Sequence, residues 1–401
     1  MKKIFILALM MLGTSVAFAA ESEALKAVLK AKTYSEAAQL LHSSLSQLTG
    51  EEKAKAYNKL VDLASEKFEK EILTITANQT AEQLGKGKVE PYDTLGFYES
   101  AYNGLMAGLE CDKYDNEPNE KGKVKPKFRE LNVNRLQRLR TQLLNAGNWA
   151  AESSNNADML KYWGAYVDSK DAPVFASLKG QEDQYLSQVA MLTSRVAYIV
   201  GDYAKANKYI DCALADEKLY NDALPIKLAI NEKLLKSKED TLSYLKEVEA
   251  LYASNSSNDK LFSTLVQLYT NLGESAKSDK LIAEKLAAQP DNQLAWGLKG
   301  QNEMTKQDFE NAIQSFKKAD LNNVAVLTYL GYCINTKAAE AAAGVDSRSL
   351  YKESKEYLES ARSLDPDRQF ANWAYPLYQC YYNLFGESDA RTREIENLIS
   401  K

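Results

Sequence analysis

The stretch Gln293–Asn323, QLAWGLKGQNEMTKQDFENAIQSFKKADLNN, determines the predicted fold. It contains two apolar stripes with helical spacing, separated by a polar turn. The positions that define the stripes are Trp296 and Gly300 in the first and Phe309, Ala312, Phe316 and Ala319 in the second. Small residues let two antiparallel helices approach closely, and bulky residues fill the gap to the next pair. The stretch therefore predicts a helix hairpin built for stacking.

Related hairpins recur at a spacing of about 34 residues, which indicates a repeat architecture. Segment 259–292 keeps the aromatic and apolar positions, although Ser278 and Lys285 replace the alanines expected there. Segment 187–220 contains the turn GDYAKA at 201–206, followed by Ile210 and Ala213 at the matching distances. The chain is thus predicted to form a row of similar hairpins in this region.

These residues resemble the tetratricopeptide repeat (TPR) family, whose pattern is an aromatic four residues before a small residue, then aromatic, Ala, bulky and Ala. The resemblance implies an all-α, right-handed solenoid of antiparallel hairpins over 187–401. The predicted repeats are 187–220, 221–258, 259–292, 293–323, 324–368 and 369–401. Segment 221–258 is too long and is interpreted as a degenerate repeat. An insertion at 338–349 is expected to lengthen a first helix or a turn.

The N-terminal part, 20–186, also has helical periodicity but matches the repeat poorly. Tyr34, Ala37 and Leu41 suggest the second helix of a first hairpin. Further helices are predicted at 51–77, 91–110, 128–147 and 155–169. Because no stretch alternates long enough for a strand, we expect an irregular, degenerate TPR-like helical region.

Residues 1–19 have the pattern of a secretory signal peptide. Lys2 and Lys3 precede an apolar run, and Ala17-Phe18-Ala19 supplies a small-x-small cleavage site. The alternative, an uncleaved anchor, is disfavoured because the run is too short to span a bilayer. No cysteine at the cleavage point can accept a lipid. We therefore expect a periplasmic protein that is not a lipoprotein and has no direct membrane insertion after cleavage.

The charge balance disfavours nucleic acid and anionic lipid as partners. Removal of Lys2 and Lys3 leaves 48 basic and 55 acidic residues, a net charge of −7. Both kinds of partner reward clustered Lys and Arg. One basic cluster runs from Lys121 to Arg140, and we interpret it as a solvated loop leading into an exposed helix face.

The residues that most catalytic and metal sites need are missing. His42 is the single histidine and has no partner cluster. Phosphate-loop, dinucleotide and nucleophile-elbow motifs are absent. The loop 112–127 starts with an oxygen-rich run that leaves calcium as an alternative to a solvated loop. We predict no catalytic residue, cofactor or metal, although an enzyme with a carboxylate pair stays a third hypothesis.

The four cysteines are widely spaced and show no metal-binding pattern. Buried free thiols are the favoured interpretation for Cys111, Cys212, Cys333 and Cys380. An oxidising compartment leaves a bridge between Cys333 and Cys380 open.

The TPR resemblance implies that first helices line a concave groove that binds a protein segment. Carried onto this chain, the family's groove offsets fall on Arg195, Tyr198, Gln267, Asn271, Gln301, Thr305, Tyr329, Tyr332 and Asn335. The resemblance thus implies a non-enzymatic scaffold, and the predicted location makes its partner another envelope protein or peptide segment. The alternative is a glycan-binding or uptake accessory protein, because the 24 tyrosines include rings that can stack on sugars.

Overall fold

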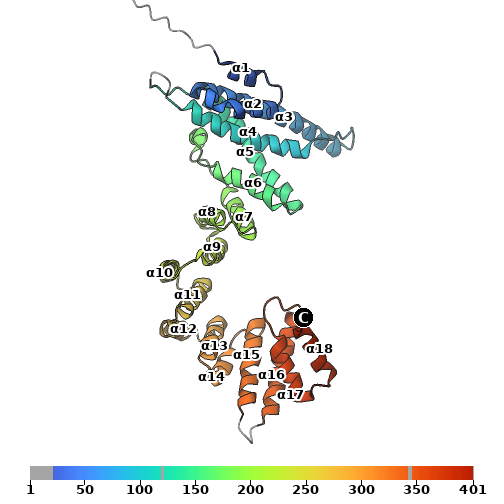
Figure 1. Cartoon of the computed structure of the whole chain (residues 1–401), viewed down its shortest axis with the longest axis vertical. Coiled ribbons are helices and arrows are strands. Elements are labelled where there is room, and N and C mark those ends of the chain that lie inside the picture. Colours follow the sequence, from blue (N-terminus) through green and yellow to red (C-terminus); the bar gives the residue numbers. More distant parts are fainter. Residues whose placement is uncertain (1–20, 119–121, 342–345, 401) are drawn as a thin grey trace, which may run out of the picture. The chain divides into compact units, whose positions relative to one another are not determined.

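The computed structural model describes residues 21–118, 122–341 and 346–400, and the predicted signal peptide lies outside them. Helices follow one another along these residues, which contain no strand. The all-α prediction is confirmed, and the fold is a TPR-like succession of helix pairs (Figure 1). None of the described helices has the length and apolar character needed to cross a membrane.

The chain forms two compact units, divided between Leu234 and Leu235. The helices of unit 1 are α1 (Glu23–Lys30), α2 (Tyr34–Ser44), α3 (Gly50–Leu84), α4 (Thr94–Asp115), α5 (Arg129–Glu152), α6 (Asn156–Asp168), α7 (Leu186–Ile199), α8 (Tyr203–Leu214) and α9 (Tyr220–Leu234), with the 3₁₀ turns η1 (Leu45–Gln47) and η2 (Pro173–Leu178). The helices of unit 2 are α10 (Lys238–Ser254), α11 (Asp259–Asn271), α12 (Ser275–Ala288), α13 (Gln293–Thr305), α14 (Phe309–Phe316), α15 (Val324–Glu340), α16 (Ser347–Leu364), α17 (Ala374–Phe385) and α18 (Ala390–Ile399). The two helices of the predicted repeat 221–258, α9 and α10, fall in different units.

Small residues set the close approach of the paired helices in unit 2. A Cβ atom on Gly300 of α13 would lie 2.8 Å from the ring of Phe316 on α14. A Cβ atom on Gly331 of α15 would lie 2.5 Å from Leu358 on α16. Each glycine therefore makes room for a bulky side chain of its partner helix. The mechanism is the one that the Trp296-to-Ala319 pattern predicts.

Side-chain caps start α11, α13 and α15, which are three of the first helices of unit 2. The carboxamide oxygens of Asn258, Asn292 and Asn323 accept hydrogen bonds from backbone N–H groups in the first turns of α11, α13 and α15. Such a cap satisfies donors that the helix itself leaves unpaired. Gly273 has a left-handed φ of 76° in the turn from α11 to α12, and Gln307 has a φ of 61° in the turn from α13 to α14.

The two polar residues that replace alanines in segment 259–292 are both buried and paired. The hydroxyl of Ser278 accepts a hydrogen bond of 2.7 Å from the Asn302 amide on α13. The Lys285 ammonium lies 2.9 Å from the Asp259 carboxylate and 5.4 Å from the ring centroid of Phe262. Segment 259–292 therefore forms a regular hairpin. Its match to the repeat pattern is weak because paired polar residues, Ser278 and Lys285, stand where the pattern has alanine.

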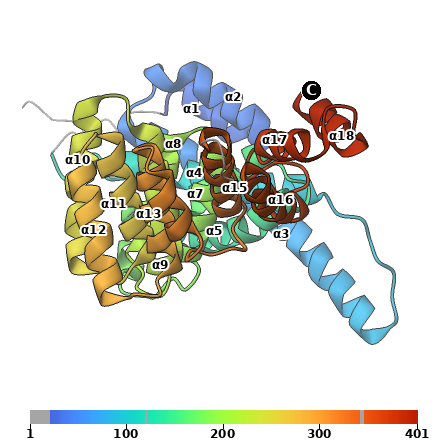
Figure 2. The ribbon, with the colours of Figure 1, turned by 90° about the horizontal axis from the view of Figure 1, so that it is seen from below.

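Unit 1 contains longer helices than unit 2. The predicted helices at 51–77, 91–110, 128–147 and 155–169 are all present, in α3, α4, α5 and α6. The first two pack through the stacked rings of Phe68 and Phe97, whose centroids are 4.9 Å apart. Figure 2 shows the C-terminal half of α3 extending beyond the neighbouring helices of unit 1. In unit 2, α15 includes residues 338–340 of the insertion, and residues 342–345 of it lie outside the described residues.

Candidate functional site

The first helices of unit 2 contact one another in sequence. Helix α11 touches α13, α13 touches α15, and α15 touches α17, in addition to the contacts within each hairpin. Their exposed side chains therefore belong to neighbouring helices that form one row. We call a set of exposed or half-buried amide, hydroxyl and tyrosine side chains of this row the first-helix face; its members are Gln267, Asn271, Gln301, Thr305, Tyr332, Tyr375, Gln379 and Tyr382.

Charge is unevenly distributed between the last two first helices, α15 and α17, and the second helices α12, α16 and α18, whereas the first helices α11 and α13 each contain one Lys and one acidic residue. Helix α17 has no charged residue, and α15 has only Lys337 and Glu340, both in its last turn. The second helices α12, α16 and α18 are rich in Lys, Arg, Asp and Glu. Because charged side chains keep a surface hydrated, the second helices are suited to face solvent. The first-helix face is instead built from amides, hydroxyls and aromatic rings.

The structure separates the predicted groove residues into two groups. Arg195 and Tyr198 lie on α7 in unit 1, where the Tyr198 ring packs edge-on against Tyr203 at 5.4 Å. The remaining predicted residues lie on α11, α13 and α15 in unit 2. Gln267, Asn271, Thr305 and Tyr332 are exposed there, and Gln301 and Tyr329 are half-buried. Seven predicted residues thus lie on one row of helices, and six of them have exposed or half-buried side chains.

Asn335 does not fit the groove prediction, because its side chain is only 3% exposed. Its amide nitrogen donates to the Pro376 carbonyl at 2.8 Å and to Gln379 Oε1 at 3.3 Å. Its amide oxygen accepts a hydrogen bond of 3.1 Å from Cys380 Sγ. The prediction for Asn335 is therefore corrected: this residue joins α15 to α17 beneath the surface.

The sequence analysis did not identify two exposed tyrosines of this face. Tyr375 and Tyr382 on α17 are 53% and 47% exposed, and Tyr332 on α15 is 43% exposed. On α17, Tyr375, Gln379 and Tyr382 have the spacing i, i+4, i+7, which puts them on one side of the helix. The i, i+4, i+7 spacing identifies these residues as one side of a helix. The TPR pattern matches α17 too weakly, however, to assign groove positions on that helix.

Many other tyrosines use their hydroxyls to hold helices together. The hydroxyl of Tyr381 donates to Glu359 at 2.8 Å, and that of Tyr269 donates to Glu249 at 2.7 Å. Burial raises the pKa of Tyr381 to about 12, and the hydrogen bond to Glu359 acts in the same direction. By contrast, no described group pairs with the hydroxyls of Tyr332, Tyr375 and Tyr382.

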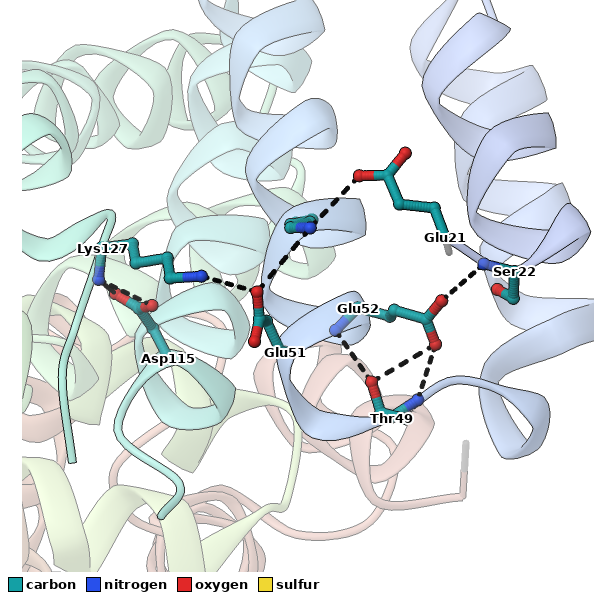
Figure 3. Close-up of polar contacts among 8 residues, drawn as sticks. Glu21, Ser22, Thr49, Glu51, Glu52, Asp115 and Lys127 are labelled. Carbon is teal, nitrogen blue, oxygen red and sulfur yellow. Dashed lines mark hydrogen bonds and ion pairs between the residues drawn. The ribbon is translucent and has the colours of Figure 1, made fainter. Parts of the chain in front are cut away.

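Two of the carboxylates in the alternative calcium site, Asp112 and Asp115, are already bonded to other groups of the protein. Asp115 accepts from the backbone N–H groups of Lys127 and Phe128, each bond to its Oδ2 being 2.8 Å long. Asp112 forms a two-bond ion pair with Arg129 at 2.7 and 2.8 Å. Figure 3 shows Asp115 and Lys127 closing the loop, with the Lys127 ammonium directed at Glu51. Among the described residues, which omit 119–121, no group of three or more His, Cys, Asp or Glu side chains could hold a metal ion.

The basic cluster from Lys121 to Arg140 ends in the protein interior. Arg140 is 4% exposed, which corrects the prediction of an exposed helix face at this residue. Its guanidinium donates to the Tyr166 carbonyl, to the Ser169 hydroxyl and to the Asp183 carboxylate. It also lies 3.9 Å above the centre of the Tyr166 ring. Arg140 therefore fastens the segment between α6 and α7 to α5.

The thiols offer no activated nucleophile. Burial raises the pKa of Cys111 and of Cys333 to about 12 and that of Cys380 to about 11. A thiol needs a lowered pKa to react at neutral pH. All four cysteines are free in the structure, so Cys333 and Cys380 do not pair in it.

Comparisons with known proteins assign no family to this chain. No family model matches the chain, and no curated protein matches it. One similar solved structure is a TPR repeats protein from Bacteroides fragilis NCTC 9343. It is 16% identical, the match covers 61% of this chain and 98% of that chain, and the TM-score is 0.26. Such a low TM-score adds nothing to the fold class, which rests on the helix pairs themselves: this is an all-α helical-repeat protein of the TPR-like type.

Proposed function

We propose that this chain is a non-enzymatic scaffold that binds a segment of another protein along the first-helix face of unit 2. The observation that supports the proposal is the contrast between α15 and α17, which have no charged residue before the last turn of α15, and the charged second helices α12, α16 and α18. Interfaces are depleted of charge at their centre and enriched in aromatic side chains. The exposed Tyr332, Tyr375 and Tyr382 give this face that composition.

The chemistry of the face also fits a polypeptide. Each peptide group presents one donor and one acceptor, and the amides of Gln267, Asn271 and Gln301 offer both kinds of group. Tyrosine rings give large contact area with little loss of conformational entropy. A row of adjacent helices provides the length that an extended segment or a helix needs.

The proposed location is the periplasm, and the proposed partner is another protein of the cell envelope. This part of the proposal is supported by the signal-peptide pattern of residues 1–19, which lie outside the described residues. Cell fractionation with a C-terminal tag tests it, since periplasmic release after osmotic shock is expected and retention with the spheroplasts is not.

Co-purification with a matched pair of triple variants tests the binding function. One variant changes three residues of the first-helix face, Gln267→Ala, Gln301→Ala and Tyr332→Ala. Its control changes three exposed residues of second helices, Lys280→Ala, Glu356→Ala and Arg393→Ala. After mild cross-linking, we expect one reproducible protein with the wild type and the control, and its loss with the face variant. Equal recovery with both variants would refute the proposed surface.

A further inference from the structure

Asn335 is buried beneath the first-helix face, and its neighbours fix which way its carboxamide points. The carbonyl oxygen of Pro376 lies 2.8 Å from the amide nitrogen of Asn335. A carbonyl oxygen only accepts hydrogen bonds, so the NH₂ end of the carboxamide must face it. The oxygen at the other end accepts from the Cys380 thiol at 3.1 Å. A turn of the carboxamide by 180° would set two oxygens against each other at Pro376.

The orientation of Asn335 in turn fixes that of Gln379. The same NH₂ group of Asn335 donates its second hydrogen to Gln379 Oε1 at 3.3 Å. Because an amide nitrogen does not accept hydrogen bonds, the atom of Gln379 that faces Asn335 must be the oxygen. The NH₂ group of Gln379 therefore points away from Asn335. It has no partner among the described residues and is not one of their buried unpaired polar atoms, so it reaches solvent.

Two other amides of the first-helix face are not held in this way. No hydrogen bond joins the carboxamide of Gln267 or of Gln301 to another described residue. Each of these groups can turn by 180° and present either its oxygen or its NH₂ group. Gln379 differs from them because its outward group is set by the buried contact between α15 and α17.

We propose that Asn335 is a positioning residue of the first-helix face, which makes Gln379 a fixed hydrogen-bond donor toward the bound segment. The segment then offers an acceptor, such as a backbone carbonyl, at this point. The inference rests on the proposed function and deepens it. Asn335 is only 3% exposed, so it acts through Gln379 and not by touching the partner. A donor that is already oriented loses little freedom on binding, and a segment without an acceptor there leaves it unpaired.

NMR spectroscopy of the purified full chain tests the orientation without any partner. With ¹⁵N in the side-chain amides of Asn and Gln, a neutral gadolinium chelate broadens the NH₂ signals that it can approach. We expect strong broadening for Gln379 and none for Asn335, which is the internal control. The NH₂ order parameter of Gln379 should also exceed that of Gln301. A protected Gln379 NH₂ group, or one as mobile as that of Gln301, would overturn the inference.

A pair of buried variants separates positioning from packing. Asn335→Ala removes the bond to Gln379, and the order parameter of Gln379 should fall to the value of Gln301. Ser354→Ala is the matched control, because Ser354 is also buried and its hydroxyl lies 3.3 Å from the Cys380 thiol, but it has no bond to Gln379. That control should leave the Gln379 order parameter unchanged. Equal mobility of Gln379 in both variants would reduce Asn335 to a packing role.

The effect on binding is measured with a photoreactive amino acid at position 332 in the native cell. Gln379→Glu keeps an oxygen for Asn335 but replaces the outward donor with an acceptor. Gln301→Glu is the matched control, since it adds the same charge at another half-buried position of the face. We expect the adduct yield to fall about tenfold with Gln379→Glu and about twofold or less with Gln301→Glu.

The outcomes distinguish this inference from the function on which it rests. Equal losses with the two glutamate variants would overturn the fixed donor and leave the scaffold function standing. Absence of any adduct with wild-type side chains at both positions would contradict the scaffold function itself. The NMR result decides the orientation of Gln379 in either case.

Discussion

The buried amide of Asn335 on α15 donates to Gln379 Oε1 on α17 at 3.3 Å, and thereby orients a surface side chain from below. The same amide group bonds to the Pro376 carbonyl and to the Cys380 thiol. The residue thus couples the packing of the last two first helices to the chemistry of their exposed face.

Asn335→Ala should lower the free energy of unfolding by about 2 kcal/mol, because it leaves buried polar groups without partners. Asn271→Ala is the matched control, since Asn271 is exposed on α11 and should change the free energy by about 0.5 kcal/mol or less. Urea denaturation followed by circular dichroism measures both. Equal effects of the two variants would show that the Asn335 bonds contribute nothing to stability.

Asp183→Ala should be far more destabilising than Glu69→Ala, although both remove the partner of an arginine on α5. Asp183 pairs with the buried Arg140, so its loss strands a buried charge and should cost about 3 kcal/mol. Glu69 pairs with Arg138 at the surface and should contribute about 0.5 kcal/mol or less. Urea denaturation of the two variants in parallel measures both changes in the free energy of unfolding. Similar losses would mean that the ion pair between Arg140 and Asp183 contributes no more to stability than the surface pair.

Gln307→Gly should stabilise the protein by about 0.5 kcal/mol. Gln307 has a left-handed φ of 61°, which strains a residue with a Cβ atom, and glycine removes that strain at some entropic cost. Gln314→Gly, at an exposed position inside α14, should instead destabilise by about 1 kcal/mol. In differential scanning calorimetry, the melting temperature should therefore rise for Gln307→Gly and fall for Gln314→Gly. A lower melting temperature for Gln307→Gly would contradict the assigned backbone conformation.

Native-state labelling with N-ethylmaleimide at pH 8 should modify Cys212 first. Burial raises the pKa of all four thiols, but Cys212 is only half-buried, and Lys170, whose ammonium lies 3.9 Å from its sulfur, acts against that rise. Cys111, Cys333 and Cys380 should react only after denaturation. Mass spectrometry of the intact protein and its peptides follows the sites. Early modification of Cys111, or a Cys333–Cys380 disulfide in non-reduced protein, would contradict the structure.

The sequence predicted the helices well because local patterns determine them. Gly300 and Phe316 had to meet once their stretch formed a hairpin, and the long apolar stripe around Phe68 required a helix. The border between the two units was not predictable in the same way. It falls between two helices that are each regular, so it depends on packing over many residues and leaves no mark in the helical period.

The candidate site was only partly predictable for a related reason. Family offsets located Gln267, Asn271 and Tyr332 on exposed positions, because those offsets follow from the hairpin alone. Asn335 is buried by α17, and Arg140 is bonded to the segment before α7, in contacts between elements that are distant in sequence. Tertiary contacts of this kind override what a local pattern indicates.

Site-specific photo-cross-linking in the native cell tests the central claim most directly. A photoreactive amino acid replaces Gln301 or Tyr332 on the first-helix face, or Lys280 or Glu356 on the second helices. The account predicts one protein adduct of defined mass from the first two positions and none from the last two. Adducts of equal yield from both pairs, or adducts from the second helices alone, would contradict a scaffold that binds through its first helices.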